Sequence, residues 1–212
     1  MAKLRNGING EITGKVGSVI GSHWRGISYI RSVSNKKKRV NSPAQLQQQA
    51  RFSLLASFLH IFKSLLSISF SKYTMRMTGS NEALSFNLLH GIKGNYPNLE
   101  LNYPEILLSC GSLKGAHNAM AKAGEAGAVD FSWVNVEEDF PANGSDCVIL
   151  VIYNPSTKLG FQTLQGALRE SGTASITIDD NRGCTVETWL AFMSGNAKCF
   201  SDSIYTGTVI TT

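Results

Sequence analysis

Residues 42–95 carry the clearest helical pattern of the chain. Large apolar residues recur there at intervals of three and four, as on one face of an α-helix: Leu54, Leu55, Phe58, Leu59, Phe62, Leu65 and Leu66. Ser42-Pro43 supplies a start signal, because a hydroxyl can accept from the first free amides and proline suits the first helical position. A second helix is expected over residues 80–89, since Gly91 then stands just past its end. With a turn near Thr78-Gly79, the pattern predicts an αα-hairpin.

This hairpin would have one apolar face that must be covered. Its packing residues are expected to be Leu55, Phe58, Leu59, Phe62 and Leu66. The face could pack on the C-terminal half of the chain or on another subunit, and the sequence leaves both open. We expect no membrane span here, because His60, Lys63 and several serines interrupt the apolar run.

After Asn95-Tyr96-Pro97 the period of the apolar pattern changes from about 3.6 to 2. Val129, Phe131 and Trp133 alternate with other residues and should share one face of a strand. About seven strands are expected, with glycine, asparagine and aspartate between them: 106–109, 129–134, 147–153, 161–168, 174–178, 185–193 and 203–210. The number of strands and the inward tryptophan on the second one predict an immunoglobulin/fibronectin-like antiparallel β-sandwich, with a small barrel as the alternative.

Residues 1–41 are punctuated by glycine, at positions 7, 10, 14, 17, 21 and 26. Such spacing is unsuited to a helix and weakens a strand, so it predicts an extended arm that lies on another surface. Only residues 26–33 alternate well enough to predict a strand. The expected fold class is therefore α+β, with an arm (1–41), a helical hairpin (42–95) and a β-sandwich (96–212).

Charge divides the chain sharply. Residues 1–95 hold 14 Lys and Arg against two acidic residues, a net charge of +12, whereas residues 96–212 hold six against 13, a net −7. The residues expected to contact nucleic acid or an acidic partner are Arg25, Arg31, Lys36, Lys37, Lys38 and Arg39. Trp24 and Tyr29 lie among them and could stack on bases. The acidic partner could equally be the acidic half of a neighbouring copy, or the cations could form a solvated face with no partner.

The sequence contains few residues or motifs typical of catalytic or metal-binding sites. The four cysteines and four histidines show no metal-ligand spacing, and we expect free thiols, with a Cys184–Cys199 bridge as the alternative. Gly14-Lys15 resembles part of a phosphate-binding loop, but Val16 stands where a hydroxyl residue is needed. The chain contains no Gly-x-Ser-x-Gly motif. The sequence thus predicts a protein without enzymatic activity, cofactor or metal. No signal peptide is recognisable, which favours a cytoplasmic or virion location.

A series of short motifs, in order along the chain, supports a resemblance. They are Asn6-Gly7-Ile8, Gly14-Lys15-Val16-Gly17, Trp24-Arg25-Gly26, Arg31-Ser32, Asn95-Tyr96-Pro97, Val151-Ile152-Tyr153-Asn154-Pro155, Gly166-Ala167 with Arg169 and Gly172, and Ser203-Ile204-Tyr205 with Gly207. Together they resemble an uncharacterised bacterial family of proteins of about this length, domain of unknown function 6266. The resemblance implies no activity, cofactor or site residue.

The arm, the apolar hairpin and the opposed charges predict a structural or assembly protein that forms a homo-oligomeric array, as in a phage virion or a phage-derived particle, with other particle proteins as further partners. The first alternative is a sequence-independent nucleic-acid-binding or packaging-associated protein that uses the basic arm. A second alternative is a sandwich that binds ligands through its end loops.

Overall fold

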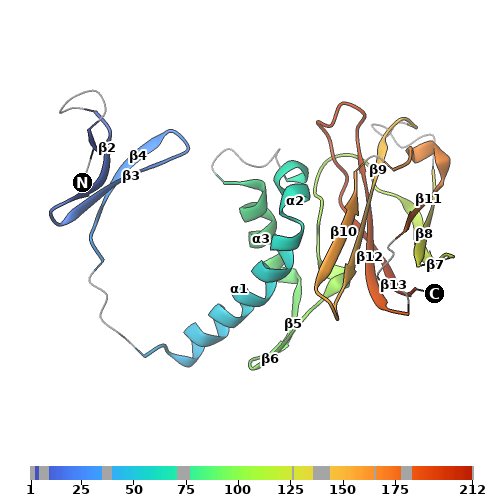
Figure 1. Cartoon of the computed structure of the whole chain (residues 1–212), viewed down its shortest axis with the longest axis horizontal. Helices are drawn as coiled ribbons and strands as arrows, with labels where there is room; N and C mark the ends of the chain where they lie inside the picture. Colours follow the sequence, from blue (N-terminus) through green and yellow to red (C-terminus); the bar gives the residue numbers. More distant parts are fainter. Residues whose placement is uncertain are drawn as a thin grey trace. The chain divides into compact units, whose positions relative to one another are not determined.

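The computed structural model describes residues 3–4, 10–34, 40–70, 77–125, 127–135, 144–164, 166–177 and 183–211 (Figure 1). The chain divides into two compact units, Met1–Ser42 and Pro43–Thr212. The expected boundary near residue 95 does not separate units, because the helices share a core with the sandwich.

The first unit is an antiparallel sheet, which we call the N-terminal sheet. Its strands follow in chain order: β1 (Lys3–Leu4), β2 (Ile12–Val16), β3 (Val19–Trp24) and β4 (Ile27–Ser32). The structure corrects the expectation of an extended arm here, since the glycines serve as turns and close contacts. Gly17 and Gly26 take positive φ values of 55° and 82° in the two tight turns. A Cβ atom at Gly21 would collide with the carbonyl of Ile12 on the neighbouring strand.

The second unit begins with three helices, α1 (Pro43–Ile61), α2 (Lys63–Ser69) and α3 (Gly79–His90). Thr78 caps α3, where its hydroxyl accepts from the amide of Asn81 at 3.3 Å. The first expected helix is broken at Phe62, and α1 and α2 meet at a bend of 87°. The bend keeps the apolar residues of both helices in one core.

The rest of the unit is an antiparallel β-sandwich. One sheet has the order β11 (Thr173–Thr177), β8 (Ala128–Val134), β7 (His117–Ala123), and the other β10 (Leu159–Thr163), β9 (Cys147–Asn154), β12 (Thr185–Met193), β13 (Ile204–Ile210). The α+β class with an antiparallel sandwich is therefore confirmed. The two sheets are separate, in contrast to the alternative of a small barrel. Val129, Phe131 and Trp133 are buried on one face of β8, as their alternation predicts.

Two elements differ from the expected strands. The segment 106–109 is not a strand, although Ile106 and Leu108 are buried. The first strand of the sandwich is instead β7, whose His-Asn-Ala-Met-Ala-Lys-Ala sequence is poor in β-branched residues and gives little strand signal. A further hairpin, β5 (Ile92–Asn95) and β6 (Asn98–Leu101), follows α3.

Strand β9 is buried on both faces, and this explains its continuous apolar sequence. Val148, Leu150 and Ile152 belong to the core between the sheets. Ile149, Val151 and Tyr153 belong to a second core, which the helices form on the outer face of the four-stranded sheet. The second unit thus has three layers, with the helices next to β10 and β9 and the three-stranded sheet on the far side (Figure 1).

Candidate functional site

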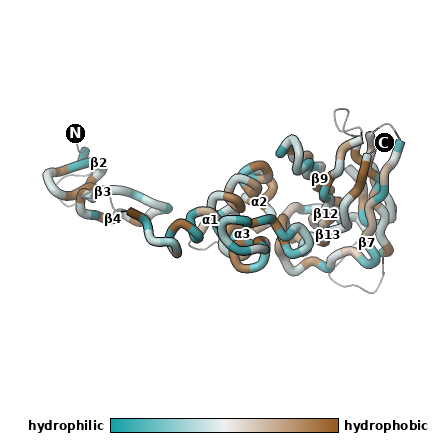
Figure 2. The backbone as a smooth tube through the Cα atoms, turned by 90° about the horizontal axis from the view of Figure 1, so that it is seen from below, coloured by the Kyte–Doolittle hydropathy of each residue, from teal (hydrophilic) through white to brown (hydrophobic). Residues whose placement is uncertain are grey.

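The N-terminal sheet has no hydrophobic core of its own. Among the residues that the structure describes, neither core cluster includes a member of the first unit. Every residue of β4 is exposed, although β3 and β4 carry apolar stretches (Figure 2). A small sheet needs a covered apolar face to be stable by itself, so the described part of this sheet is a candidate interaction surface.

The register between β3 and β4 groups the exposed side chains. Directly opposed residues of an antiparallel pair share a face, and the pairs Trp24–Ile27, Ser22–Tyr29 and Ile20–Arg31 alternate with the others. We call the side that carries these six residues the aromatic face. Three of its apolar members are well exposed, Ile27 at 63%, Trp24 at 49% and Tyr29 at 45%, whereas Ile20 is partly buried. Arg31, one of the expected contact residues, therefore shares a face with both aromatic rings.

Arg25 lies at the tip of the β3–β4 hairpin with a φ of 45°, a left-handed conformation that is uncommon for a residue with a side chain. The side chain of His23 organises this turn. The amide of Gly26 donates to Nε2 of His23 at 3.2 Å, which leaves the ring proton of neutral histidine on Nδ1. Nδ1 lies 3.2 Å from Oε1 of Glu11, so that proton points to a carboxylate. Arg25 is thus presented from an organised turn.

The remaining expected contact residues, Lys36, Lys37, Lys38 and Arg39, lie outside the described residues.

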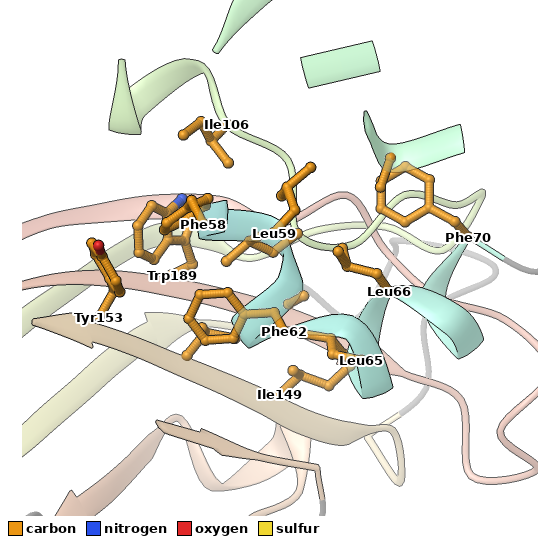
Figure 3. Packing of buried hydrophobic residues seen from close by; sticks show 14 of the residues in the cluster. Phe58, Leu59, Phe62, Leu65, Leu66, Phe70, Ile106, Ile149, Tyr153 and Trp189 are labelled. Carbon is orange, nitrogen blue, oxygen red and sulfur yellow. The ribbon is translucent and has the colours of Figure 1, made fainter. Parts of the chain in front are cut away.

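The five expected hairpin-packing residues all lie in the core between the helices and the outer face of the four-stranded sheet (Figure 3). Phe58 contacts Tyr153 on β9 with ring centroids 4.9 Å apart and Trp189 on β12 at 6.1 Å. Of the two alternatives left open by the sequence, the structure shows packing on the C-terminal half of the same chain. Leu55, Phe58, Leu59, Phe62 and Leu66 are buried there.

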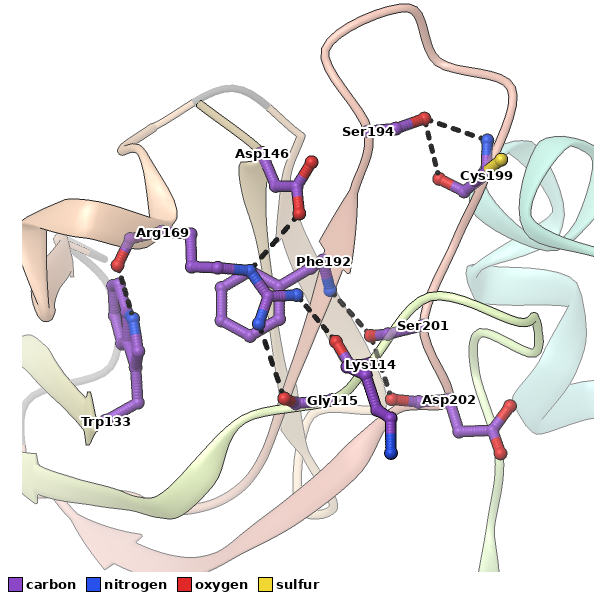
Figure 4. A network of polar contacts seen from close by, with 10 residues as sticks. All are labelled: Lys114, Gly115, Trp133, Asp146, Arg169, Phe192, Ser194, Cys199, Ser201 and Asp202. Carbon is purple, nitrogen blue, oxygen red and sulfur yellow. Dashed lines mark hydrogen bonds and ion pairs between the residues drawn. The ribbon is translucent and has the colours of Figure 1, made fainter. Parts of the chain in front are cut away.

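A buried ion pair, absent from the sequence-based expectations, joins the loops around the sandwich (Figure 4). Nε of Arg169 lies 3.2 Å from Oδ2 of Asp146, and Nη2 donates to the carbonyl of Lys114 at 2.5 Å. The guanidinium carbon also lies 3.7 Å from the ring centroid of Phe192. The indole of Trp133 donates to the carbonyl of Arg169 at 2.8 Å. These contacts connect three loops and leave the guanidinium enclosed, so the pair is structural.

The described residues offer little else of chemical interest. They contain no group of three or more His, Cys, Asp or Glu positioned to hold a metal ion. None of the four cysteines forms a disulfide, Cys184 and Cys199 included, and all four are partly buried. Burial, with Asp202 nearby, raises the pKa of the Cys110 thiol to about 11, which keeps it protonated and unreactive at neutral pH.

Among the helices of the described ranges, no single one is long and apolar enough to cross a membrane. Only α1 and α2 taken together reach that length and composition, across their 87° bend.

A comparison with protein families shows to which family the chain belongs. A family model, "Family of unknown function (DUF6266)", matches residues 11–207. The chain belongs to this family. The resemblance inferred from the short motifs is thereby confirmed. No curated protein matches the chain.

Two solved structures are similar to part of the chain. The fn3 domain of human collagen alpha-1(XX) has a TM-score of 0.35 at 11% identity, over 46% of this chain and 84% of that chain. The FN1–FN3 domains of chicken CNTN1 have a TM-score of 0.38 at 7% identity, over 48% of this chain and 35% of that chain.

Proposed function

We propose that the protein is a non-enzymatic structural protein that assembles with further copies of itself through the N-terminal sheet. The observation that carries this proposal is the exposed aromatic face, with Trp24, Ile27 and Tyr29 on a sheet that lacks a core. Exposed apolar patches of this kind mark interaction surfaces.

Charge favours another copy as the covering surface. The first unit holds nine Lys and Arg against one acidic residue, a net charge of +8, and the second unit holds 11 against 14, a net −3. Opposite net charges steer the basic sheet of one copy toward an acidic surface of another. A contact between unlike surfaces leaves each copy able to bind the next, which gives a ring or an open array. A phage virion or phage-derived particle as the setting stays a prediction of the sequence.

The test is the mass of the full chain in solution, measured by light scattering over a range of concentrations and salt. We expect an oligomer at micromolar concentration that the double substitution Ile27→Ser with Tyr29→Ser reduces to a monomer. The matched control is Leu89→Ser, because Leu89 is exposed at 75% but lies on α3 of the second unit. A full chain that stays monomeric at high concentration and low salt would overturn the proposal.

A second candidate function, sequence-independent nucleic-acid binding, is favoured by one observation. Arg31 shares the aromatic face with Trp24 and Tyr29, and cations beside stacking rings suit single-stranded nucleic acid. The test is binding of single-stranded and duplex DNA by the full chain across a salt series. We expect Arg25→Ala with Arg31→Ala to weaken binding and to reduce its salt dependence. Binding that is unchanged in this variant would exclude the aromatic face as the contact.

A further inference from the structure

The second unit contains a cleft with a volume of about 590 Å³ that the sequence did not suggest. Three tyrosines line it, and we call it the tyrosine cleft. Tyr103 comes from a short 3-10 helix, η2 (Tyr103–Glu105), Tyr153 from the end of β9 and Tyr205 from β13. Cavities of this size are typical of sites for small molecules or single side chains.

A buried carboxylate forms part of the cleft wall. Glu187 lies on β12, opposite Tyr153 on one neighbouring strand and Thr208 on the other, and is only 7% exposed. Its Oε2 atom accepts from the hydroxyl of Tyr205 and from Oγ1 of Thr208, the latter at 3.0 Å. The carboxylate is therefore held in one orientation by two neutral donors on β13.

No cation within the described ranges balances the charge of Glu187. Among the described residues, no Lys, Arg or His forms an ion pair with its carboxylate. Two lysines lie at the cleft, but Lys93 pairs with Glu100 at 3.6 Å, and Lys158 is exposed on the turn after β9. Burying a carboxylate that no cation compensates is unfavourable, and a cationic ligand in the cleft would relieve that cost.

The tyrosines supply neutral aromatic walls around this charge. Burial raises the pKa of Tyr103 and of Tyr205 to about 12, and Glu187 contributes to both shifts. Both phenols consequently stay neutral throughout the physiological range. Neutral aromatic rings attract cations through their faces, most strongly where water is excluded.

We propose that the tyrosine cleft binds an organic cation, a guanidinium or alkylammonium group, with Glu187 as its counter-ion and the three tyrosines as its walls. The cation has two possible sources, an arginine or lysine side chain of another copy of this chain, or a free amine. All residues of the site belong to the second unit, so binding of a free amine can be tested whether or not the chain assembles through the N-terminal sheet.

The experiment measures binding of L-arginine amide to the full chain by isothermal titration calorimetry at low ionic strength. L-citrulline amide is the matched ligand control, because it has nearly the same shape without the charge. We expect saturable binding of the arginine derivative and binding of the citrulline derivative that is weaker by about tenfold or more, the equivalent of ~1.4 kcal/mol. Equal binding of both, or binding of neither, would overturn the proposal without any variant.

Variants then locate the cation. Glu187→Gln retains an oxygen that can accept from Tyr205 and Thr208 but removes the charge, and we expect it to abolish the preference for arginine amide. Glu100→Gln is the control carboxylate at the rim, where Glu100 is 73% exposed, and should change the affinity little. Lys158→Ala should leave the affinity unchanged or increase it, because it removes a like charge. A folded Glu187→Gln protein that still prefers arginine amide to citrulline amide as strongly as wild type would contradict the role of Glu187 as counter-ion.

Light scattering in the presence of arginine amide distinguishes the two sources. If the amide binds through Glu187 and lowers the mass of the oligomer, the natural occupant is a side chain of another copy. If it binds through Glu187 and the mass does not change, the occupant is a free cation. Both outcomes support the site, and a chain that is monomeric throughout can still show Glu187-dependent binding.

Discussion

The ring of Phe58 on α1 meets the ring of Tyr153 on β9 edge to face, with centroids 4.9 Å apart and planes at 89°. This contact lies between the helices and the outer face of the four-stranded sheet, where an immunoglobulin-like sandwich would otherwise present a sheet surface to solvent. The helices and the sandwich are consequently one folding unit, and substitutions at their contact should affect the stability of both.

Phe58→Ala should lower the free energy of unfolding by about 3–5 kcal/mol, because it removes a buried ring and leaves a cavity. Phe52→Ala is the control on the same helix, since Phe52 is 49% exposed, and it should change stability by no more than about 0.5 kcal/mol. Urea unfolding followed by tryptophan fluorescence reports both values. Equal effects of the two substitutions would contradict the helix–sheet core.

Gly160 on β10 provides a second test of the same contact. A Cβ atom there would lie 2.5 Å from Cζ of Phe62 and 2.6 Å from Cγ2 of Ile61. Gly160→Ala should therefore destabilise the protein by about 1–3 kcal/mol through overpacking, and adding Phe62→Leu should restore part of the loss. Gly195→Ala is the matched control, because the nearest atom to its Cβ is 3.7 Å away. Gly160→Ala unfolding at the same urea concentration as wild type would show that β10 and α1 are not in contact.

How far the sequence predicts this fold depends on which faces each element buries. The alternation of Val129, Phe131 and Trp133 identified β8 and its buried face, because one face of that strand is solvated. The apolar sequence of β9 is enough to predict a strand. That both of its faces are buried can be predicted only if the helices are known to pack on the sheet. This packing depends on contacts between residues more than 80 positions apart, such as Phe58 and Tyr153. Strand β7 was missed because pairing with β8, and not its own alanine-rich sequence, makes it a strand.

The candidate sites were predicted less well. The sequence predicts Arg25 and Arg31 as contact residues, and only the register of β3 with β4 shows that Arg31 shares a face with Tyr29 and Trp24. The glycines of this region predict an arm because glycine weakens strands, whereas in the structure Gly17 and Gly26 form the turns of a sheet. The sequence does contain an indication of Glu187, which is the one charged residue in the nine-residue apolar strand Thr185–Met193.

The ion pair of Arg169 and Asp146 should respond differently to single and double substitution. Arg169→Met leaves a buried carboxylate without its guanidinium and should cost about 3–5 kcal/mol in the free energy of unfolding. Arg169→Met with Asp146→Leu removes both charges, and we expect it to recover much of that loss. Urea unfolding measures the stabilities, and the near-ultraviolet circular dichroism of Trp133, which donates to the Arg169 carbonyl, reports the local packing. A double variant as unstable as the sum of the two single ones would indicate that the two side chains are not energetically coupled, and would contradict this prediction.

The tyrosine cleft predicts a loss of stability at alkaline pH. Burial, with Glu187 as a further cause, raises the pKa of Tyr103 and Tyr205 from the ordinary value of 10.0 to about 12. Between these two pH values the unfolded chain has lost phenolic protons that the folded chain still binds, so the free energy of unfolding falls as pH rises. Below pH 10 both states hold the protons, and the contribution is fully present.

Phenolate absorbance and urea unfolding test this prediction together. Tyr103, Tyr153 and Tyr205 should titrate above the ordinary phenol pKa of 10.0, since burial raises the pKa of all three. Because other side chains also lose protons at alkaline pH, the wild-type chain is compared with the double variant Tyr103→Phe/Tyr205→Phe. In this variant the free energy of unfolding should fall less steeply above pH 10. Glu187→Gln should move the titration of Tyr205 to lower pH, because it removes the charge that disfavours the phenolate. A wild-type chain in which Tyr103 and Tyr205 titrate at the ordinary value of 10.0 would mean that the cleft is open to water and that Glu187 does not face Tyr205.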